Sequence, residues 1–376
     1  MQASALDAMT AVAEVNLSAL ANNVEVLRAH VKGDAAMLVA VKADAYGHGL
    51  LPTARALADL GVPWFGVATP HEALQIRKAG IPGRILVFGP QRGDAIDALA
   101  DASVDVTVTT LEDVAALEER ISARSGDPLR VHVKVNTGMA RLGLSPAEAL
   151  PVAREVARRD GLRLEGVWTH FARADEVGVE TTDTQLAAFE TFLGMLEAEG
   201  VTPTLRHAAN SAATLTRPDA HFDLVRPGIS VYGYPPSADL DDVASGLAPV
   251  MHVHAPVVFT QAVRAGTPVS YGHRWTAPVD TNLVTVRFGY ADGYPRALTN
   301  LGDGSVKGQR VRVVGTVCMD QLLLDVGDVT VRVGDRVSLL GGDAPGADAL
   351  AARVDSIAYE LLTRISPRVE RRYVGD

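Results

Sequence analysis

Cysteine is almost missing from this sequence of 376 residues. Its single cysteine, Cys318, lies in the apolar segment "VVGTVCMD", which is more typical of a small buried side chain than of a reactive thiol. One cysteine excludes an intrachain disulfide framework and leaves no CxxC-type cluster for a metal ion. We therefore expect neither disulfides nor a metal site.

Long apolar runs and an excess of basic residues are also missing. No stretch approaches the roughly 20 apolar residues that a membrane-spanning helix needs, so we expect no membrane partner. The formal net charge of −10 argues against a nucleic-acid partner, because neutralising phosphates requires clustered Lys and Arg. The N-terminal segment carries Asp7 and Glu14 and lacks a basic start, which argues against a secretory signal. These features predict a cytoplasmic protein whose partner is a small molecule.

Lysine is scarce as well, since it occurs only at positions 32, 42, 78, 134 and 307, and arginine supplies nearly all other positive charge. Lys42 and Lys134 both lie in apolar, strand-like segments, "MLVAVK" and "VHVKVN". Only an amine can readily lose its proton and act as a nucleophile. These two lysines are therefore candidates for a chemical role.

Short apolar runs alternate with amphipathic, helix-like segments from residue 12 to 245. Ser18 and Ser145 are candidate N-caps for two of these segments. Eight such units predict an α/β protein with a parallel (β/α)8 TIM-like barrel. An open doubly wound sheet is the alternative, which the count of eight and the absence of GxGxxG after the first run disfavour. The runs are "AMLVAVK", "WFGVAT", "RILVFG", "DVTVTT", "VHVKVN", "LEGVWTH", "LRHAAN" and "LVRPGI".

The pattern changes after residue 245. Alternating β-branched runs separated by Gly, Asp and Asn turns predict a mostly antiparallel β domain over residues 246–376. Residues 1–11 are a candidate addition to this domain, and the barrel is assigned to residues 12–245. The segment "ADALAARVDSIAYELLTRI" predicts one last helix.

Polar residues follow several of the eight barrel runs. Barrel enzymes carry their active sites at the carboxyl ends of the strands, so residues from independent units meet there. Phosphate sites commonly follow strands seven and eight, where Ser211 and the N–H groups of Gly228 and Ile229 supply donors. A lysine opposite such a loop indicates a covalent link to a phosphorylated aldehyde, and pyridoxal 5'-phosphate fits. The remaining candidates at these strand ends are Lys42, Lys134, His170, Asn210 and Arg226.

The chain also resembles a known family, the fold-type III alanine racemases, over nearly its whole length. The segments that carry the resemblance are "VAVKADAYGHG", "VKVNTGMARLG", "THFARADE", "ANSAAT", "RPGISVYG", "VSYGHRWTA", "GYADGYPR" and "CMDQ", in this order. The resemblance implies a barrel followed by a β domain, bound pyridoxal 5'-phosphate, and a head-to-tail homodimer with shared active sites.

By this resemblance Lys42 binds the cofactor and is one of two bases. Tyr271 is the second base, supplied by the partner subunit, although by itself a tyrosine in a β domain is usually a packed aromatic. Arg226 faces the pyridine nitrogen and keeps it unprotonated, because arginine holds its proton firmly; His170 lies beside Arg226. From the residues alone, two alternatives remain open: Arg226 could form an ordinary ion pair, and His170 could be a buried core histidine.

The resemblance also assigns the substrate site. Arg141 binds the substrate carboxylate, for which its planar fork is suited. Lys134 is a carbamylated lysine that positions Arg141, although a neutral amine or an ammonium balanced by chloride remains open. The further assignments are Tyr46, Asn210, Ser211, Gly228 and Ile229 for the cofactor, and Tyr290, Arg296, Met319 and Asp320 for the substrate entrance and pocket.

Three positions depart from the family pattern. Asn136 stands in place of the usual Asp, Ala140 in place of a common Gly, and Pro367 where some members have a phosphate-binding tyrosine, with Tyr373 as a candidate replacement. The predicted function is interconversion of L- and D-alanine, which supplies D-alanine for peptidoglycan. The alternatives are a broader racemase acting on serine or other amino acids, a decarboxylase of related architecture, and a non-catalytic pyridoxal phosphate carrier, which would lack the β domain.

Overall fold

The computed structural model describes residues 9–122 and 124–375 and divides them into two compact units. The first unit comprises residues 9–20, 46–49 and 249–375, and the second comprises residues 21–45 and 50–248. The second unit is the expected barrel, and the first contains the expected β domain. Residues 1–8, part of the segment 1–11 that we assigned as a candidate addition to the β domain, lie outside the described residues.

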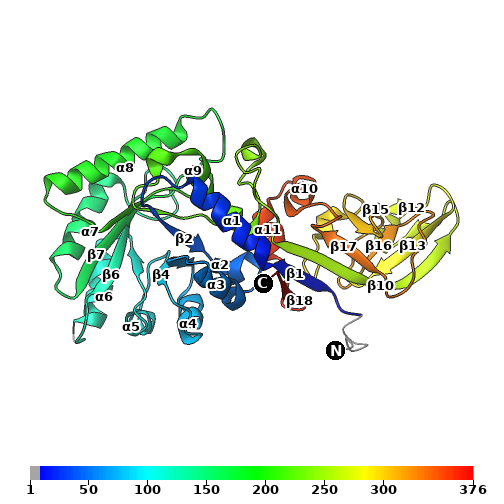
Figure 1. Ribbon diagram of the computed structural model, residues 1–376, viewed down its shortest axis with the longest axis horizontal. Helices are drawn as coiled ribbons and strands as arrows, with labels where there is room; N and C mark the ends of the chain where they lie inside the picture. Colours follow the sequence, from blue (N-terminus) through cyan, green and yellow to red (C-terminus); the bar gives the residue numbers. More distant parts are fainter. Residues whose placement is uncertain (1–8, 123, 376) are drawn as a thin grey trace. The chain divides into compact units, whose positions relative to one another are not determined.

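Eight parallel strands form the barrel, and they coincide with the eight apolar runs of the sequence (Figure 1). Two four-stranded sheets, β4-β3-β2-β9 and β5-β6-β7-β8, are joined by a parallel bridge between Leu86 and Asp105. Backbone hydrogen bonds from Asp223 to Arg206 and from Arg226 to Ala209 close the ring between β8 and β9. The strands are β2 (Ala36–Ala40), β3 (Trp64–Val67), β4 (Arg84–Val87), β5 (Val106–Val108), β6 (Leu129–Lys134), β7 (Leu162–Trp168), β8 (Leu205–His207) and β9 (Leu224–Val225).

Helices lie outside these strands, as Figure 1 shows for α3 to α8. Sequence signals set several of their ends: Thr69 and Glu72 form a capping box at α4, and Ser145 and Glu148 form one at α7. The helices are α1 (Leu17–His30), α3 (Leu50–Asp59), α4 (Pro70–Lys78), α5 (Asp94–Asp101), α6 (Leu111–Ile121), α7 (Pro146–Arg158), α8 (Thr181–Ala198) and α9 (Ser211–Thr216), with the 3₁₀ turns η2 (Pro218–Ala220), η3 (Ile229–Tyr232) and η4 (Ala238–Leu240).

The β domain is built on one eight-stranded sheet in the order β13-β16-β15-β14-β17-β10-β1-β18, and β13 also pairs with β10. All its pairings are antiparallel except that of β1 with β18. Its strands are β1 (Val12–Asn16), β10 (Met251–Val263), β13 (Thr281–Val286), β14 (Asp303–Val306), β15 (Gln309–Val313), β16 (Leu322–Asp325), β17 (Arg336–Leu340) and β18 (Glu370–Val374). The pair β11 (Pro268–Val269) and β12 (Trp275–Thr276) and the 3₁₀ turns η5 (Tyr271–His273) and η6 (Arg296–Leu298) complete it.

Three details differ from the sequence predictions. Ser18 is not an N-cap: helix α1 begins at Leu17, and Asn16 Oδ1 accepts a hydrogen bond from the N–H of Ala19 at 3.0 Å. Strand β1, which we placed at the start of the barrel, pairs with β10 and β18 and belongs to the β-domain unit. The prediction of a single last helix is wrong, because the segment forms two short helices, α10 (Ala347–Ala352) and α11 (Ala358–Thr363). The chain turns between them at Asp355, whose φ of 52° cannot continue a right-handed helix.

Candidate functional site

A left-handed turn carries the first candidate residue, Lys42. The turn α2 (Lys42–Tyr46) directly follows the first barrel strand, and its residues 43–46 all have φ between 53° and 55° although none is glycine. Each such residue costs roughly 1–2 kcal/mol. Strained backbone of this kind persists only where surrounding contacts hold it, and it is concentrated at functional sites.

Glu72 at the start of α4 supplies part of that support. Its Oε1 accepts a hydrogen bond from the N–H of Ala43 at 2.7 Å, while its Oε2 accepts from the N–H groups of Ala68 and Thr69. Asp44 Oδ1 accepts from the N–H of Leu50 at 2.7 Å. Sequence reasoning missed the role of Glu72, although the capping-box pattern "TPHE" could have indicated it.

Four predicted cationic residues of the barrel lie within electrostatic reach of one another. Desolvation lowers the pKa of Lys42, with Arg141 lowering it further and Glu72 opposing. Desolvation, with Arg226 and Arg141 adding to it, lowers the pKa of Lys134 to about 7. No carboxylate of the described chain lies within ion-pair distance of Lys42, Lys134, Arg141 or Arg226. Their positive charge is therefore suited to anionic ligands.

His170 belongs to the same group, which we call the barrel cluster (Lys42, Lys134, Arg141, His170 and Arg226). Its pKa lies well below the usual range, first because of desolvation and then because of the other four members. The imidazole is consequently neutral at neutral pH. A neutral His170 can orient its neighbours without adding charge, which agrees with the role that the resemblance implies for it.

Arg226 follows β9 and is buried. Its Nη2 donates to the carbonyl oxygens of Thr169 and Ala208 at 2.7 and 2.9 Å, and its Nη1 donates to His207 Nδ1 at 3.0 Å. Burial lowers its pKa to about 9, so it is still a cation at neutral pH. Three fixed contacts give this guanidinium one orientation.

The predicted phosphate donors lie together after β8 and β9. The Ser211 hydroxyl accepts a hydrogen bond from the N–H of Gly228 at 2.7 Å, which leaves its own proton to be donated. The N–H of Ile229 lies at the start of η3. Asn210 caps α9 through its Oδ1, which accepts from the N–H of Ala213 at 3.1 Å. The Ser211 hydroxyl and the N–H of Ile229 fit an oxyanion such as phosphate, whereas the N–H of Gly228, also predicted as a phosphate donor, is directed at Ser211 instead.

Two of the departures from the family pattern are accommodated locally. Asn136 Oδ1 accepts from the N–H groups of Gly138 and Ala140, as a carboxylate would. Ala140 has φ 53°, the left-handed conformation that a glycine adopts more easily. Arg141 directly follows this turn.

The segment 46–49 and the C-terminal strand lie in the β-domain unit. Arg371 donates to the carbonyl oxygen of Gly47 from both Nε and Nη2, and the Tyr373 hydroxyl donates to His48 O at 3.0 Å. The Tyr46 side chain is buried, and the centre of its ring lies 6.0 Å from the centre of the Tyr359 ring. Burial raises the pKa of the Tyr46 hydroxyl. Tyr373, the candidate replacement for the phosphate-binding tyrosine, thus binds the backbone of this segment.

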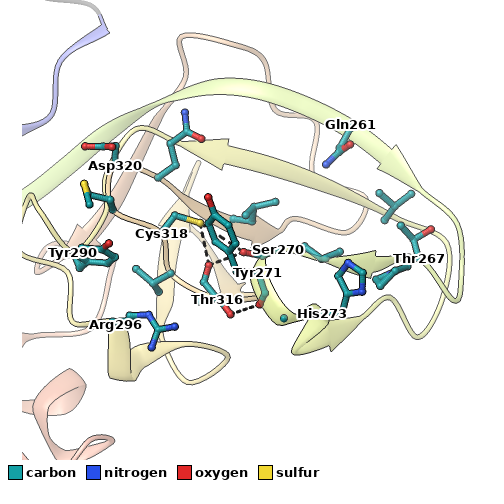
Figure 2. Close-up of a pocket in the computed structure, with 18 residues that line it drawn as sticks. Gln261, Thr267, Ser270, Tyr271, His273, Tyr290, Arg296, Thr316, Cys318 and Asp320 are labelled. Atoms are coloured by element: carbon teal, nitrogen blue, oxygen red, sulfur yellow. Dashed lines mark hydrogen bonds between the residues drawn. The ribbon is translucent and has the colours of Figure 1, made fainter.

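The remaining predicted residues line one hollow of about 1020 Å³ in the β domain (Figure 2). Figure 2 shows Tyr271 with Ser270, Thr316 and Cys318 close to it. Thr316 Oγ1 donates to the carbonyl oxygen of Tyr271 at 2.7 Å, which fixes the backbone, while the Tyr271 side chain is 74% exposed. The predicted residues in this hollow, which we call the tyrosine hollow, are Tyr271, Tyr290, Arg296, Met319 and Asp320.

Close backbone approach shapes the tyrosine hollow. The N–H groups of Tyr290 and Ala291 donate to the carbonyl oxygens of Cys318 and Met319 at 3.0 and 2.9 Å. A Cβ at Gly289 would lie 2.2 Å from the Met319 carbonyl oxygen, so only glycine fits there. Asp320 pairs with Arg368 at 2.8 Å.

Comparison with known proteins gives a consistent result. The sequence matches the family models "Alanine racemase, N-terminal domain" over residues 15–236 and "Alanine racemase, C-terminal domain" over residues 250–373. It is 44% identical to an alanine racemase of Frankia casuarinae, with 96% of each chain covered, and 45% identical to one of Salinispora tropica, with 96% of this chain and 98% of that protein covered. The crystal structure of an alanine racemase from D-cycloserine-producing Streptomyces lavendulae superposes with a TM-score of 0.93 at 40% identity, covering 98% of both chains. No helix in residues 9–122 or 124–375 is both long and apolar enough to span a membrane.

Proposed function

Because this chain belongs to the alanine racemase family, we propose that Lys42 and Tyr271 are the two bases with which it performs the family reaction, the pyridoxal-phosphate-dependent interconversion of L- and D-alanine. D-Alanine from this reaction serves bacterial peptidoglycan. The observation that carries the assignment is the barrel cluster, whose cations have no carboxylate within ion-pair distance among the residues described. A phosphate and a substrate carboxylate supply the opposite charge.

The residues at the barrel strand ends fit pyridoxal 5'-phosphate. Ser211 and Ile229 would hold its phosphate, with Gly228 orienting the Ser211 hydroxyl through its N–H. Lys42 would bind its aldehyde carbon, and Arg226 would face its ring nitrogen. Asn210, Tyr46 and His170 are proposed as further cofactor-binding residues. When bound, the cofactor withdraws electrons from the substrate α-carbon and so weakens its C–H bond. Arg226, held by two carbonyl oxygens and His207, limits proton transfer to the ring nitrogen.

Protons move on opposite faces of the α-carbon. Lys42 Nζ takes the α-proton on one face, a role that its lowered pKa favours. The hydroxyl of Tyr271 delivers a proton on the other face, and the two groups exchange roles in the reverse direction. Arg141 binds the substrate carboxylate through its two N–H edges and so fixes which face each base meets.

Lys134 is proposed to carry a carbamate. Its pKa of about 7 makes a neutral amine available at neutral pH. That amine adds to carbon dioxide, forming an N–C bond and releasing one proton. The product is an anion near Arg141 and Arg226, which replaces an unfavourable third cation with an opposite charge.

A homodimer with shared active sites completes the proposal. Tyr271 is 74% exposed, and Tyr290 and Met319 beside it in the tyrosine hollow are 40% and 53% exposed. Exposed aromatic and apolar side chains grouped in this way suit an interface with a second copy of the chain. The tyrosine hollow of one subunit would then supply Tyr271, Tyr290, Met319 and Asp320 to the barrel of the other, in a cytoplasmic enzyme.

Borohydride reduction tests the assignment of Lys42. Protein purified with pyridoxal phosphate should be yellow, lose this colour on reduction, and carry the cofactor on the peptide that contains Lys42. A colourless protein that takes up no cofactor would contradict the proposal. A panel of L-amino acids, followed by loss of α-hydrogen to deuterium oxide, should show alanine as the preferred substrate; equal exchange of serine and longer amino acids would indicate the broader racemase.

A further inference from the structure

Two histidines occupy the interior of the barrel where apolar side chains are usual. His132 lies in β6 and His207 ends β8, and both are fully buried. The side chains that fill such barrels are mostly Val, Ile and Leu, because polar groups there must all find partners. Neither histidine was singled out by the sequence, and their contacts explain why they are tolerated.

Hydrogen bonds link these histidines into one chain between a carboxylate and Arg226. Arg226 Nη1 lies 3.0 Å from His207 Nδ1, and His207 Nε2 lies 3.0 Å from His132 Nδ1. His132 Nε2 lies 3.1 Å from Oδ2 of Asp105, a buried residue directly before β5. Asp105 also accepts from Arg84 Nη2 at 2.5 Å and from Arg130 Nε at 2.7 Å.

The donor and acceptor roles along this chain are determined by its ends. A guanidinium can only donate, so His207 Nδ1 accepts and the His207 proton lies on Nε2. This proton is donated to His132 Nδ1, and the His132 proton therefore lies on Nε2 and is donated to Asp105. A doubly protonated His132 would require both nitrogens of His207 to accept, which an imidazole with one N–H cannot do.

The backbone makes room for this arrangement. His132 is paired with Gly166 in β7, the strand between β6 and β8, and a Cβ at Gly166 would lie 2.3 Å from His132 Nδ1. This is the nitrogen that accepts from His207. The His207 ring is also stacked on Trp168, with the centroids 5.7 Å apart and the planes 5° apart. Packing therefore fixes both rings.

We propose that Asp105, His132 and His207 are positioning residues that hold the Arg226 guanidinium and supply its remote counter-charge through fixed histidine tautomers. No carboxylate in the described part of the chain pairs directly with Arg226, and a buried cation without an acceptor network is costly. The chain of hydrogen bonds gives Arg226 an oriented acceptor whose polarity is set by the Asp105 carboxylate. The consequence for the reaction rests on the proposed function, in which Arg226 faces the cofactor ring nitrogen.

Asp105→Asn tests the proposal, and Glu165→Gln is its matched control. Glu165 is buried nearby and binds the same Arg84 at 2.7 Å, but it forms no hydrogen bond or ion pair with a histidine of the described residues. In ¹⁵N-histidine-labelled holoenzyme, His132 and His207 should each show one neutral tautomer with the proton on Nε2. Asp105→Asn should change this signature at both residues, and Glu165→Gln should leave it unchanged. An unchanged signature in Asp105→Asn, or an equal change in both variants, would overturn the proposal.

The reaction supplies a second readout. A less firmly held Arg226 should allow more transamination, so Asp105→Asn should raise transamination events per racemisation turnover about tenfold, which corresponds to ~1.4 kcal/mol. His132→Phe retains a ring, leaves Asp105 with both arginines, and should give the same rise. The double variant should behave as His132→Phe alone, because the link is already broken; additive effects would show two independent structural roles and contradict the chain.

The outcomes separate this inference from the proposed function. If Asp105→Asn fails to fold, His132→Phe decides by the His207 signal and the transamination ratio; if His132→Phe fails to fold, Asp105→Asn decides by both histidine signals and the same ratio. A wild-type protein that binds no cofactor would refute the proposed function, while its histidine tautomers would still test the chain of hydrogen bonds. Normal racemisation with no difference between Asp105→Asn and Glu165→Gln would refute the proposed role of the hydrogen-bond chain and leave the proposed function intact.

Discussion

The side-chain nitrogen of Lys134 lies 4.1 Å from the centre of the Trp168 ring. A cation over an indole face gains some electrostatic stabilisation, yet burial and two nearby arginines still lower the pKa of this lysine to about 7. The indole face is therefore an incomplete substitute for a negative charge. Carbamylation is the modification that would remove this conflict.

Carbamylation predicts a signal that depends on Lys134. Protein equilibrated with ¹³C-bicarbonate should show a carbamate resonance in ¹³C NMR, because the neutral amine can add carbon dioxide. Lys134→Met should abolish this resonance, whereas Lys78→Arg, a change at the last residue of α4, should retain it. A resonance that persists in Lys134→Met would place the carbamate elsewhere.

Without the carbamate, Lys134 should make the free energy of unfolding depend on pH. In buffer free of carbon dioxide, the pKa of about 7 in the folded protein lies below the ordinary lysine pKa of 10.5. Between these values the unfolded chain binds more protons, so the free energy of unfolding should rise with pH by up to ~1.4 kcal/mol per unit relative to Lys134→Met. Urea unfolding at pH 7, 8 and 9 measures this difference. A difference that stays constant or falls with pH would contradict the lowered pKa.

Glu72→Gln should change the chemistry of Lys42 as well as stability. The Glu72 carboxylate raises the pKa of Lys42, so its removal should lower that pKa and move the pH midpoint of cofactor uptake downward. Glu148→Gln removes the equivalent capping carboxylate of α7 and is the matched control. Both variants should lose some stability, because a neutral amide accepts the capping hydrogen bonds less strongly than a carboxylate, but only Glu72→Gln should shift the midpoint. Equal midpoints in both variants would show that Glu72 acts as a cap alone.

Gly289→Ala should damage the tyrosine hollow. The added methyl group would meet the carbonyl oxygens of Met319 and Cys318 at 2.2 and 2.4 Å, so the backbone that places Tyr290 must move. We expect a loss of at least about 1–3 kcal/mol in stability and a larger fractional loss of kcat/KM. Gly194→Ala in α8, where a Cβ meets nothing within 4 Å, should instead be neutral or slightly stabilising. Urea unfolding and racemisation assays compare the two, and similar behaviour would be inconsistent with this packing.

The barrel and most of its cluster could be predicted from the sequence because periodicity and strand ends are local properties. The eight runs correspond to β2 through β9, and Lys42, His170 and Arg226 come together as expected. The pairing partners of a strand are not local, which is why β1 was assigned to the barrel although it pairs with β10 and β18. Likewise, no glycine in residues 43–46 announces the left-handed turn that carries Lys42.

The contacts that support the site were harder to predict than the residues that we propose to react. Glu72, Asp105, His132 and His207 occur in ordinary helix and strand patterns, and their importance comes from contacts between distant segments. Gly166 is informative only once His132 is known to face it. Sequence therefore indicated the residues that we propose to react, whereas the contacts that orient them required the structure.

The two-base assignment is tested most directly by α-deuterium washout from L- and D-[2-²H]alanine with Tyr271→Phe. The variant should bind cofactor normally, because Lys42 is intact and the lost hydroxyl belongs to a side chain that is 74% exposed. Washout from the enantiomer whose α-deuterium faces Lys42 should persist, and washout from the other should fall by at least about 100-fold, the lower range for loss of a general base. Washout from both enantiomers at the wild-type rate would contradict the account.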